Sequence, residues 1–404
     1  KMYHPHDNYS ILATLKADGS IEKTVVGSIA ESLTLDSHDT ASYNRLKKFS
    51  EMNPCSLLLL PLPKMDNYSQ NGDKLKTAIT AFAEKWVENN LVEPEFLTYV
   101  TSNKVSFPWT MIDKITPRPN TSVEELLKKD GVQDLDPVIT GKHTYVAPFV
   151  NSEECEYLVI EDTFPNGRPA LEKSGFIFTD RETVDKVERM KVCTCLNPLH
   201  TALAVFGCLL DYKLIAEEMK DSTLKTLVER LGYQEGLPVV TDPGILNPKE
   251  FLDTVLGIRI PNPFMPDTPQ RIATDTSQKL SIRYGETIKA YEKSSTLQTS
   301  DLKMIPLVFA GWLRYLTGKN DRLEDFPVSP DPMADILGSV VSSVKLDGTC
   351  SVEHAESLLH PVLENEKIWG VNLYDAGLAP SVCHYFIEMT KGAGAVRSTL
   401  EKYV

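Results

Sequence analysis

The sequence predicts an α/β domain over residues 1–180 followed by an all-α domain over residues 181–404. Strand-like and helix-like patterns alternate up to about residue 180, and beyond it apolar residues recur at helical spacing to the end of the chain. The chain has 404 residues, which suits two domains at roughly one per 150 residues. A boundary between two domains is a place where ligand sites commonly form.

The first half is expected to open with a β-hairpin, because the turn residues Ala17–Ser20 separate the strand-like segments Tyr9–Leu15 and Ile21–Ser28. Helices are expected at Ser42–Met52 and, strongly amphipathic, at Asp73–Val87. Further strands are expected at Ser56–Leu60, Phe96–Thr101, Glu156–Asp162 and Gly175–Phe178. The proline-rich segments Phe107–Asn120 and Phe164–Pro169 are predicted to be ordered loops, the former with a short turn of helix.

Helical periodicity dominates the second half. The runs with this spacing are Leu209–Leu231, Leu280–Tyr291, Ile305–Leu316, Met333–Ser343 and Pro380–Val404. Four prolines between residues 261 and 269 separate two of these runs. The sequence contains no internal repeat and no low-complexity tract.

Composition excludes several classes of protein. The net charge is −14 and the pI about 5.1, whereas nonspecific nucleic-acid binding needs a basic footprint. The apolar run Leu57–Leu62 is too short for a membrane span, no other window approaches one, and the N-terminus has no signal-peptide core. The seven cysteines are scattered, and Cys193 and Cys195 have no second pair at zinc spacing. We expect a cytoplasmic protein with reduced thiols, no metal site, and neither nucleic-acid nor membrane partners.

The stretch Lys186–Leu210 lies just after the predicted boundary and places Lys191, Asn197 and His200 close together. Asn197 followed by Pro198 predicts a helix N-cap with proline at the first helical position. A lysine, an amide and an imidazole at a helix start can handle a proton. A core helix with a polar start is the alternative that the stretch leaves open.

Four further clusters are candidates, each with a plainer alternative. Asn67 in MDNYSQNG could donate to a ligand oxygen or belong to a turn. Lys114 and Arg118 could face an anion or lie in a solvated loop. Two other pairs depend on helical spacing: Arg271 with Lys279 would lie two turns apart on one side of a helix and could bind a carboxylate, and Glu188 lies one turn before Lys191. Either pair could equally be surface charges.

Five segments together resemble the polyol-specific long-chain dehydrogenases, the family of mannitol 2-dehydrogenase, fructuronate reductase and tagaturonate reductase. They are MDNYSQNG, FPWTMIDKITPRP, VIEDTFPNGRP, ERMKVCTCLNPLH and RIATDTSQK, and they occur in the family's order. FAGWLRYLTG is similar to the family's C-terminal domain. The resemblance implies a Rossmann-type N-terminal domain followed by a helical domain, with NAD as cofactor and no metal.

The resemblance also implies roles for the matching residues. Lys191 would be the general base, Asn67 and Asn197 would hold the developing oxyanion, and His200 would orient the substrate. Glu188 would serve the proton path, whereas Arg271 and Lys279 would bind the far hydroxyls or a carboxylate. A lysine acts as a base near neutral pH only where burial or neighbouring dipoles lower its pKa, and oxyanion donors contribute about 3 kcal/mol each in comparable sites.

The sequence departs from the family's pattern in two places. The step from Lys191 to Asn197 is one residue longer, although Glu188 and His200 keep their spacings to these two residues. A local π-bulge, or the break at Pro198, would absorb the insertion. No GxGxxG-like sequence occurs in the chain, so residues 1–180 are expected to lack the first strand and phosphate loop of the dinucleotide-binding domain.

The expected activity is an NAD-dependent interconversion of a linear polyol or aldonate and its ketose or keto-uronate. The basic residues available for a carboxylate slightly favour fructuronate reductase, which interconverts D-mannonate and D-fructuronate. Mannitol 2-dehydrogenase and tagaturonate reductase are the alternatives within the family. The alternative from another class is a non-catalytic sugar-binding or scaffold protein.

Overall fold

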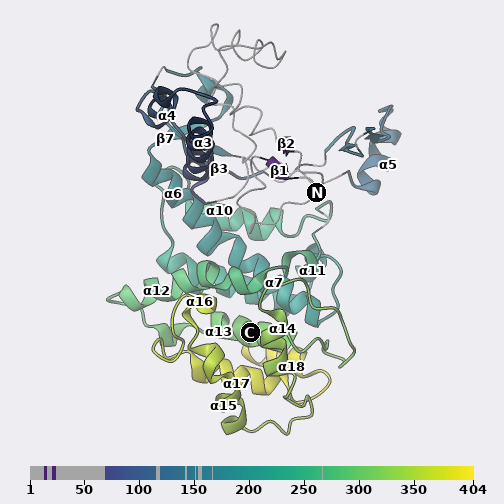
Figure 1. Cartoon of the computed structure of the whole chain (residues 1–404). Helices are drawn as coiled ribbons and strands as arrows, with labels where there is room; N and C mark the ends of the chain where they lie inside the picture. Colours follow the sequence, from purple (N-terminus) through teal and green to yellow (C-terminus); the bar gives the residue numbers. More distant parts are fainter. Residues whose placement is uncertain are drawn as a thin grey trace. The chain divides into compact units, whose positions relative to one another are not determined.

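The computed structural model describes residues 13–15, 21–23, 69–114, 119–141, 143–150, 152, 157–165, 167–265 and 267–404 (Figure 1). These residues fall into two compact units. The first unit comprises the described residues of 1–114 and 155–188, and the second those of 115–154 and 189–404. The predicted helix Ser42–Met52 and the predicted strand Ser56–Leu60 lie outside the described residues.

The predicted N-terminal hairpin is confirmed, since β1 (Ala13–Leu15) pairs antiparallel with β2 (Ile21–Lys23). Helix α3 (Asn71–Glu88) covers the predicted amphipathic segment and begins two residues before it. The strand predicted at Phe96–Thr101 is wrong, because that segment forms most of helix α4 (Pro94–Thr101). Pro94 in the first turn starts this helix, and its buried Val100 joins a small core with residues of α3.

A three-stranded sheet organises the rest of the first unit. Its strands are β3 (Thr110–Ile112), β6 (Leu158–Glu161) and β7 (Ile177–Thr179). β6 lies in the centre, antiparallel to β3 and parallel to β7. β6 and β7 confirm the strands predicted there, whereas β3 corrects the segment predicted to be only a loop.

Asn71 explains why a strand forms in that proline-rich segment. Its side-chain amide donates to the carbonyl oxygen of Thr110 at 2.9 Å and accepts from the Thr110 N–H at 3.0 Å. The start of α3 therefore satisfies the outer edge of β3 in the way that a further strand would. Gly72 allows this approach, because a Cβ there would lie 2.2 Å from the carbonyl oxygen of Phe107.

The second unit is almost entirely helical. It begins with α5 (Thr121–Lys129), β4 (Val138–Ile139) and β5 (Tyr145–Val146), the last two paired antiparallel. α6 (Arg181–Arg189) leads into it from the first unit. The longer elements that follow are α7 (Asn197–Leu209), α9 (Ser222–Arg230), α10 (Pro248–Thr254), α12 (Glu286–Lys293), α13 (Met304–Tyr315), α14 (Ala334–Val341), α15 (Val352–Leu363), α17 (Ala379–Met389) and α18 (Ala395–Tyr403).

Short helices and π-helical turns connect these elements. The short helices are α8 (Ile215–Glu218), α11 (Pro269–Ile272) and α16 (Glu366–Trp369), with 3-10 turns at Leu237–Val239, Thr276–Gln278 and Thr299–Asp301. The π-helical turns are η2 (Met190–Cys195), η3 (Leu231–Gly236), η5 (Val255–Arg259) and η7 (Ser281–Gly285). π-Helical turns are rare and are often found at functional sites.

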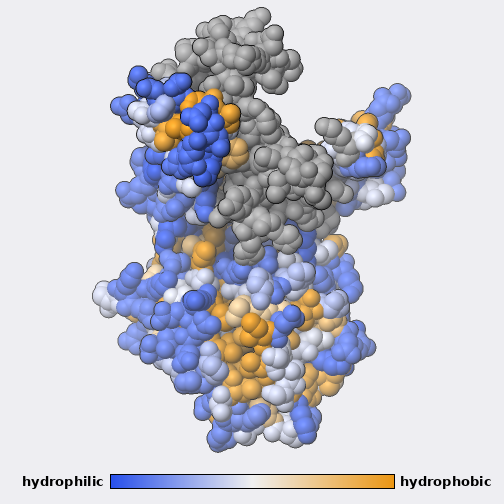
Figure 2. Space-filling view, in the orientation of Figure 1, coloured by the Kyte–Doolittle hydropathy of each residue, from blue (hydrophilic) through white to orange (hydrophobic). Residues whose placement is uncertain are grey.

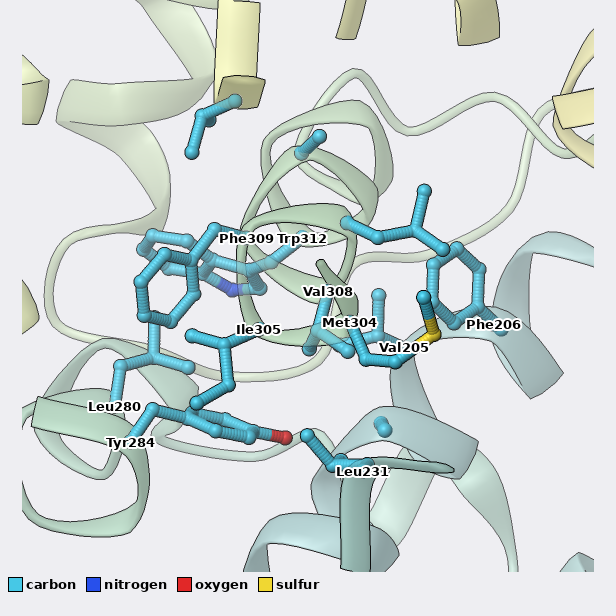
Figure 3. Close-up of a cluster of buried hydrophobic side chains, with 14 of the residues drawn as sticks. Val205, Phe206, Leu231, Leu280, Tyr284, Met304, Ile305, Val308, Phe309 and Trp312 are labelled. Carbon is cyan, nitrogen blue, oxygen red and sulfur yellow. The ribbon is translucent and has the colours of Figure 1, made fainter. Parts of the chain in front are cut away.

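The core of the second unit forms around α13, which is buried along its whole length. Figure 3 shows Ile305 and Phe309 of α13 facing Tyr284, and Val308 facing Val205 of α7. The ring centroids of Tyr284 and Phe309 lie 5.6 Å apart in a T-shaped arrangement, which is a favourable geometry for aromatic pairs. Burial of this kind fixes α7, and with it the residues at its start.

The helical run Arg181–Leu209 corrects one expectation from composition. Its length and apolarity are those of a membrane-crossing helix, although no window of the sequence was expected to approach a span. However, 83% of its apolar window is buried inside the protein. We therefore assign this run to the protein core.

Figure 2 shows that the visible surface of the second unit is largely hydrophilic, with an apolar patch around α14, where Ile336 is 61% exposed.

Glu218 at the end of α8 is a buried acid. Both its side-chain oxygens lack a hydrogen-bond partner within the described part of the chain, and the carboxyl fills the space beside Gly207, where a Cβ would lie 2.2 Å from Oε1. Burial first, and the charge of Asp221 second, raise the pKa of Glu218 well above its usual value. The folded protein therefore holds this proton more tightly than the unfolded chain does.

From this shift we predict that Glu218→Gln stabilises the protein more at pH 8 than at pH 5. For a raised carboxyl pKa, stability falls as the pH rises above the unfolded value, by up to about 1.4 kcal/mol per pH unit. Glutamine is neutral throughout and removes this dependence. Urea unfolding at both pH values measures the effect, with the exposed neighbour Glu217→Gln as control. Equal effects of the two substitutions would contradict the prediction.

Candidate active site

The extra residue between Lys191 and Asn197 is accommodated by the π-helical turn η2 (Met190–Cys195). The Leu196 N–H donates to the Lys191 carbonyl oxygen, five residues back, at 3.1 Å, which is the π-helical pattern. The ordinary α-helical pattern resumes with the His200 N–H, which donates to the Leu196 carbonyl oxygen at 3.0 Å. A π-bulge, one of the two ways of absorbing the extra residue that the sequence leaves open, is therefore present.

This turn also corrects the predicted start of α7. Leu196 is the N-cap and Asn197 the first helical residue, so the start is shifted by one residue from the prediction. The reason is the π-type bond to Leu196, which leaves that residue, with φ −128° and ψ −60°, as the break between the two helices.

Lys191 is buried, with 2% of its surface exposed. It belongs to η2, which packs against η3, η7 and α7. Glu188 is half-buried and lies three residues earlier, near the end of α6. A lysine that only forms an ion pair at the protein surface is rarely buried this deeply.

Side chains from η7 and α12 fix η2 and the start of α7. The Tyr284 hydroxyl donates to the Pro198 carbonyl oxygen at 2.6 Å, and the Thr287 hydroxyl donates to the Cys193 carbonyl oxygen at 3.3 Å. Arg283 donates to the Thr201 hydroxyl, which in turn donates to the Asn197 carbonyl oxygen at 2.9 Å. Burial lowers the pKa of Arg283 to about 10.

Asp267 joins two of the predicted residues. One of its oxygens, Oδ2, lies 3.3 Å from His200 Nε2, and the other accepts a hydrogen bond from Arg271. Burial alone would raise the pKa of Asp267, but the hydrogen bond from His200 and the charges of His200 and Arg271 outweigh it and hold the pKa below its usual value. The imidazole and the guanidinium thus share one carboxylate.

Arg271 and Lys279 do not lie on one helix, which corrects the expectation of two turns on the same side. Helix α11 ends at Ile272, and Asp275 then adopts a left-handed conformation with φ 53° before the 3-10 turn. The Asp275 N–H donates to the carbonyl oxygen of Pro330 at 2.9 Å, and this contact redirects the chain.

The bent segment nevertheless keeps Lys279 near the other cations. Its ammonium donates to the carbonyl oxygen of Thr274 and, at 3.3 Å, to that of Ile272. Burial first, and then the charge of Arg283, lower the pKa of Lys279 to about 8, with a further contribution from Arg271. Lys279 is therefore a lysine whose charge changes at mildly alkaline pH.

A small pocket lies beside His200. Three of its lining side chains are polar, namely those of His200, Arg259 and Asp267, and the others are aliphatic or Met: Leu196, Ile215, Ala216, Ile260 and Met265. Arg259 is only 6% exposed and lies over the Phe251 ring, with its guanidinium carbon 5.9 Å from the ring centroid.

Asn67 and Arg118 lie outside the described residues, and Lys114 belongs to the first unit. Within the described ranges, no group of three or more His, Cys, Asp and Glu side chains is arranged to hold a metal ion.

Sequence reasoning missed Asp267 and Arg283. The signal for Asp267 was present, since an acid four residues before Arg271 is the spacing of a helical ion pair. No comparable signal exists for Arg283, whose partner Thr201 lies 82 residues away in the sequence.

Comparison with known proteins identifies a family and several relatives. A family model described as the mannitol dehydrogenase C-terminal domain matches residues 183–388. A D-mannonate oxidoreductase from Thermotoga maritima is 45% identical and aligns with 100% of this chain and 84% of its own length. A mannitol 2-dehydrogenase from Phaeosphaeria nodorum is 29% identical over 77% of this chain and 50% of its own length.

Two solved structures are also similar. The ternary complex of Pseudomonas fluorescens mannitol 2-dehydrogenase with NAD and D-mannitol has a TM-score of 0.62 and 25% identity, over 94% of this chain and 66% of that one. A substrate-free D-sorbitol dehydrogenase has a TM-score of 0.62 and 20% identity, over 89% of this chain and 66% of that one. The chain thus spans slightly less than two thirds of each solved relative and half of the fungal enzyme.

Together the matches define a two-domain dehydrogenase fold, which confirms the predicted Rossmann-type α/β domain followed by an all-α domain. The chain belongs to the mannitol dehydrogenase family.

Proposed function

We propose that this protein is a cytoplasmic, NAD-dependent oxidoreductase that interconverts D-mannonate and D-fructuronate. The observation that carries the proposal is the buried Lys191 on a π-helical turn directly before Asn197 and His200. The 45% identity to a D-mannonate oxidoreductase across the whole chain supports a sugar-acid substrate. In this proposal residues 1–180 bind the dinucleotide and residues 181–404 bind the substrate.

The donor set fits a redox cofactor. A lysine, an amide and an imidazole can move a proton and hold an oxyanion, but none of them can accept or supply a hydride. When bound, the nicotinamide supplies that step. NAD is the cofactor named in the solved mannitol 2-dehydrogenase complex.

The chain's own residues perform the proton chemistry. During alcohol oxidation, the Lys191 amine accepts the hydroxyl proton, and burial disfavours the charged form of an amine in the direction that a base requires. Asn197, together with Asn67, donates hydrogen bonds to the oxygen that becomes the carbonyl. Glu188 relays the proton between Lys191 and water.

The remaining residues bind the end of the substrate that is far from the reacting carbon. His200 orients a hydroxyl, and Arg271 and Lys279 attract the carboxylate. A neutral polyol offers these cations only hydroxyl groups. Charge therefore favours an aldonate over mannitol, which is the substrate of the alternative within the family.

We predict that the KM for D-fructuronate rises about tenfold between pH 7 and pH 9. Lys279, with its pKa of about 8, is charged below this value and neutral above it, so its attraction for the carboxylate is present at low pH and lost at high pH. Steady-state kinetics with saturating NADH measure the effect. Lys279→Arg should keep the KM low at pH 9, because arginine stays protonated. An unchanged KM slope in that variant would remove Lys279 from the carboxylate site.

A substrate panel separates the alternatives. Purified protein is assayed with D-fructuronate, D-tagaturonate and D-fructose, each with NADH and with NADPH. We expect the highest kcat/KM for D-fructuronate with NADH. A preference for D-fructose would favour mannitol 2-dehydrogenase, and saturable sugar binding without turnover would favour a non-catalytic binding protein.

A further inference from the structure

The backbone of Asp267 is held from both sides. Its carbonyl oxygen accepts a hydrogen bond from the Ile215 N–H at 3.0 Å, and its own N–H donates to the Met265 carbonyl oxygen at 2.8 Å. Only 14% of its side chain is exposed. The carboxylate is therefore fixed in place by α8 and by the preceding turn, and not only by the side chains that it contacts.

The carboxylate contacts a different predicted site residue with each oxygen. Oδ2 faces His200 Nε2 at 3.3 Å, and Oδ1 accepts from Arg271. Arg271 is mostly exposed, with 60% of its side chain accessible, whereas His200 is 18% exposed. Asp267 thus contacts both an exposed guanidinium and a half-buried imidazole.

An ionised carboxylate can only accept hydrogen bonds. At 3.3 Å from Oδ2, Nε2 of His200 is the nitrogen that can donate to the carboxylate. In a neutral imidazole with its hydrogen there, the other nitrogen, Nδ1, is the acceptor. A hydroxyl group that contacts Nδ1 therefore donates its hydrogen to the ring.

We propose that Asp267 is a positioning residue: it fixes His200 as the Nε2–H tautomer, so that Nδ1 accepts a substrate hydroxyl, and it holds Arg271 through its other oxygen, Oδ1. The inference rests on the proposed function for the identity of the substrate, but the tautomer itself does not depend on any substrate. Asp267 touches neither the reacting carbon nor the cofactor in this account.

The first test is a tautomer measurement by long-range ¹H–¹⁵N NMR on the full chain, with the His200 signals assigned from a His200→Gln variant. We expect neutral His200 to be protonated at Nε2 in the wild-type protein and to become a tautomer mixture in Asp267→Ala. A wild-type His200 protonated at Nδ1, or one unchanged in Asp267→Ala, would overturn the proposal.

The second test is kinetic. Asp267→Asn keeps the shape but loses the charge, and we expect the KM for D-fructuronate to rise by at least about tenfold, with kcat within about threefold of wild type and NADH affinity unchanged. Asp267→Glu should restore part of the loss. Asp253→Asn, which breaks an exposed pair with Lys249, is the matched control.

The outcomes are separable. Equal losses in kcat and in melting temperature for Asp267→Asn and Asp267→Glu would assign Asp267 a purely structural role and overturn the proposal. If wild-type protein does not turn over D-fructuronate, the proposed function fails, and the tautomer measurement still decides the inference about Asp267.

Discussion

Lys191→Ala is expected to lower kcat by about 10²- to 10⁴-fold, which is the usual contribution of a general acid or base. In the proposed function the amine takes the proton from the substrate hydroxyl. No neighbouring residue of η2 can replace it, because the turn contains only Met190, Val192, Thr194 and two cysteines besides Lys191. Burial raises the pKa of one of these thiols, Cys195, to about 12, so it stays protonated. NADH binding should remain nearly intact.

Two further variants serve as controls for this prediction. Lys191→Met keeps the volume of a side chain that is only 2% exposed, so it separates loss of the amine from creation of a cavity. Lys186→Ala removes a half-buried lysine of α6 that pairs with Glu182 and should leave kcat unchanged. Added methylamine should partly restore turnover in Lys191→Ala. Turnover near the wild-type level in either Lys191 variant would place the base elsewhere.

Arg314→Met is expected to lower the free energy of unfolding by about 3–5 kcal/mol. Arg314 has no exposed surface and donates to the carbonyl oxygens of Met389 at 3.1 Å, Lys319 at 2.6 Å and Asn320 at 3.0 Å. The guanidinium thereby joins the ends of α13 and α17 to the turn that follows α13. Methionine would leave these acceptors without donors in the core.

Urea unfolding followed by circular dichroism measures this loss. Arg314→Lys should recover only a small part, because one ammonium cannot reach acceptors in three directions. Arg322→Met is the control: Arg322 is 66% exposed and pairs with Asp211 and Glu324, so its loss should stay within about 1 kcal/mol. A similar effect of Arg314→Met and Arg322→Met would contradict the assigned role.

Local pattern was enough to predict much of the fold. Helix α3, strand β6 and the hairpin of β1 and β2 follow from periodicity and turn residues. The aromatic and β-branched residues of Phe96–Thr101 suit a strand, but the segment is helical because Pro94 and the spacing of Phe96 and Val100 favour a helix. Strand β3 depends on the side chain of Asn71, 39 residues away from Thr110, which no local pattern contains.

Some residues of the candidate site can likewise be predicted from local sequence, and others cannot. Lys191, Asn197, His200 and the π-helical turn between them followed from one short motif and its spacing. Asp267 and Arg283 are known only from tertiary contacts, one with His200 and one with Thr201. Sequence motifs thus give the residues proposed to meet the substrate, whereas the residues that hold them in position depend on how α7, α11 and η7 pack.

A stoichiometric turnover measurement tests most directly whether the protein reduces D-fructuronate to D-mannonate with NADH. Full-length protein is incubated with NADH and D-fructuronate, NADH loss is followed at 340 nm, and D-mannonate is quantified by chromatography. The account predicts one D-mannonate formed for each NADH consumed, with turnover lost in Lys191→Ala. Saturable NADH binding with no NADH consumed and no D-mannonate formed would contradict it.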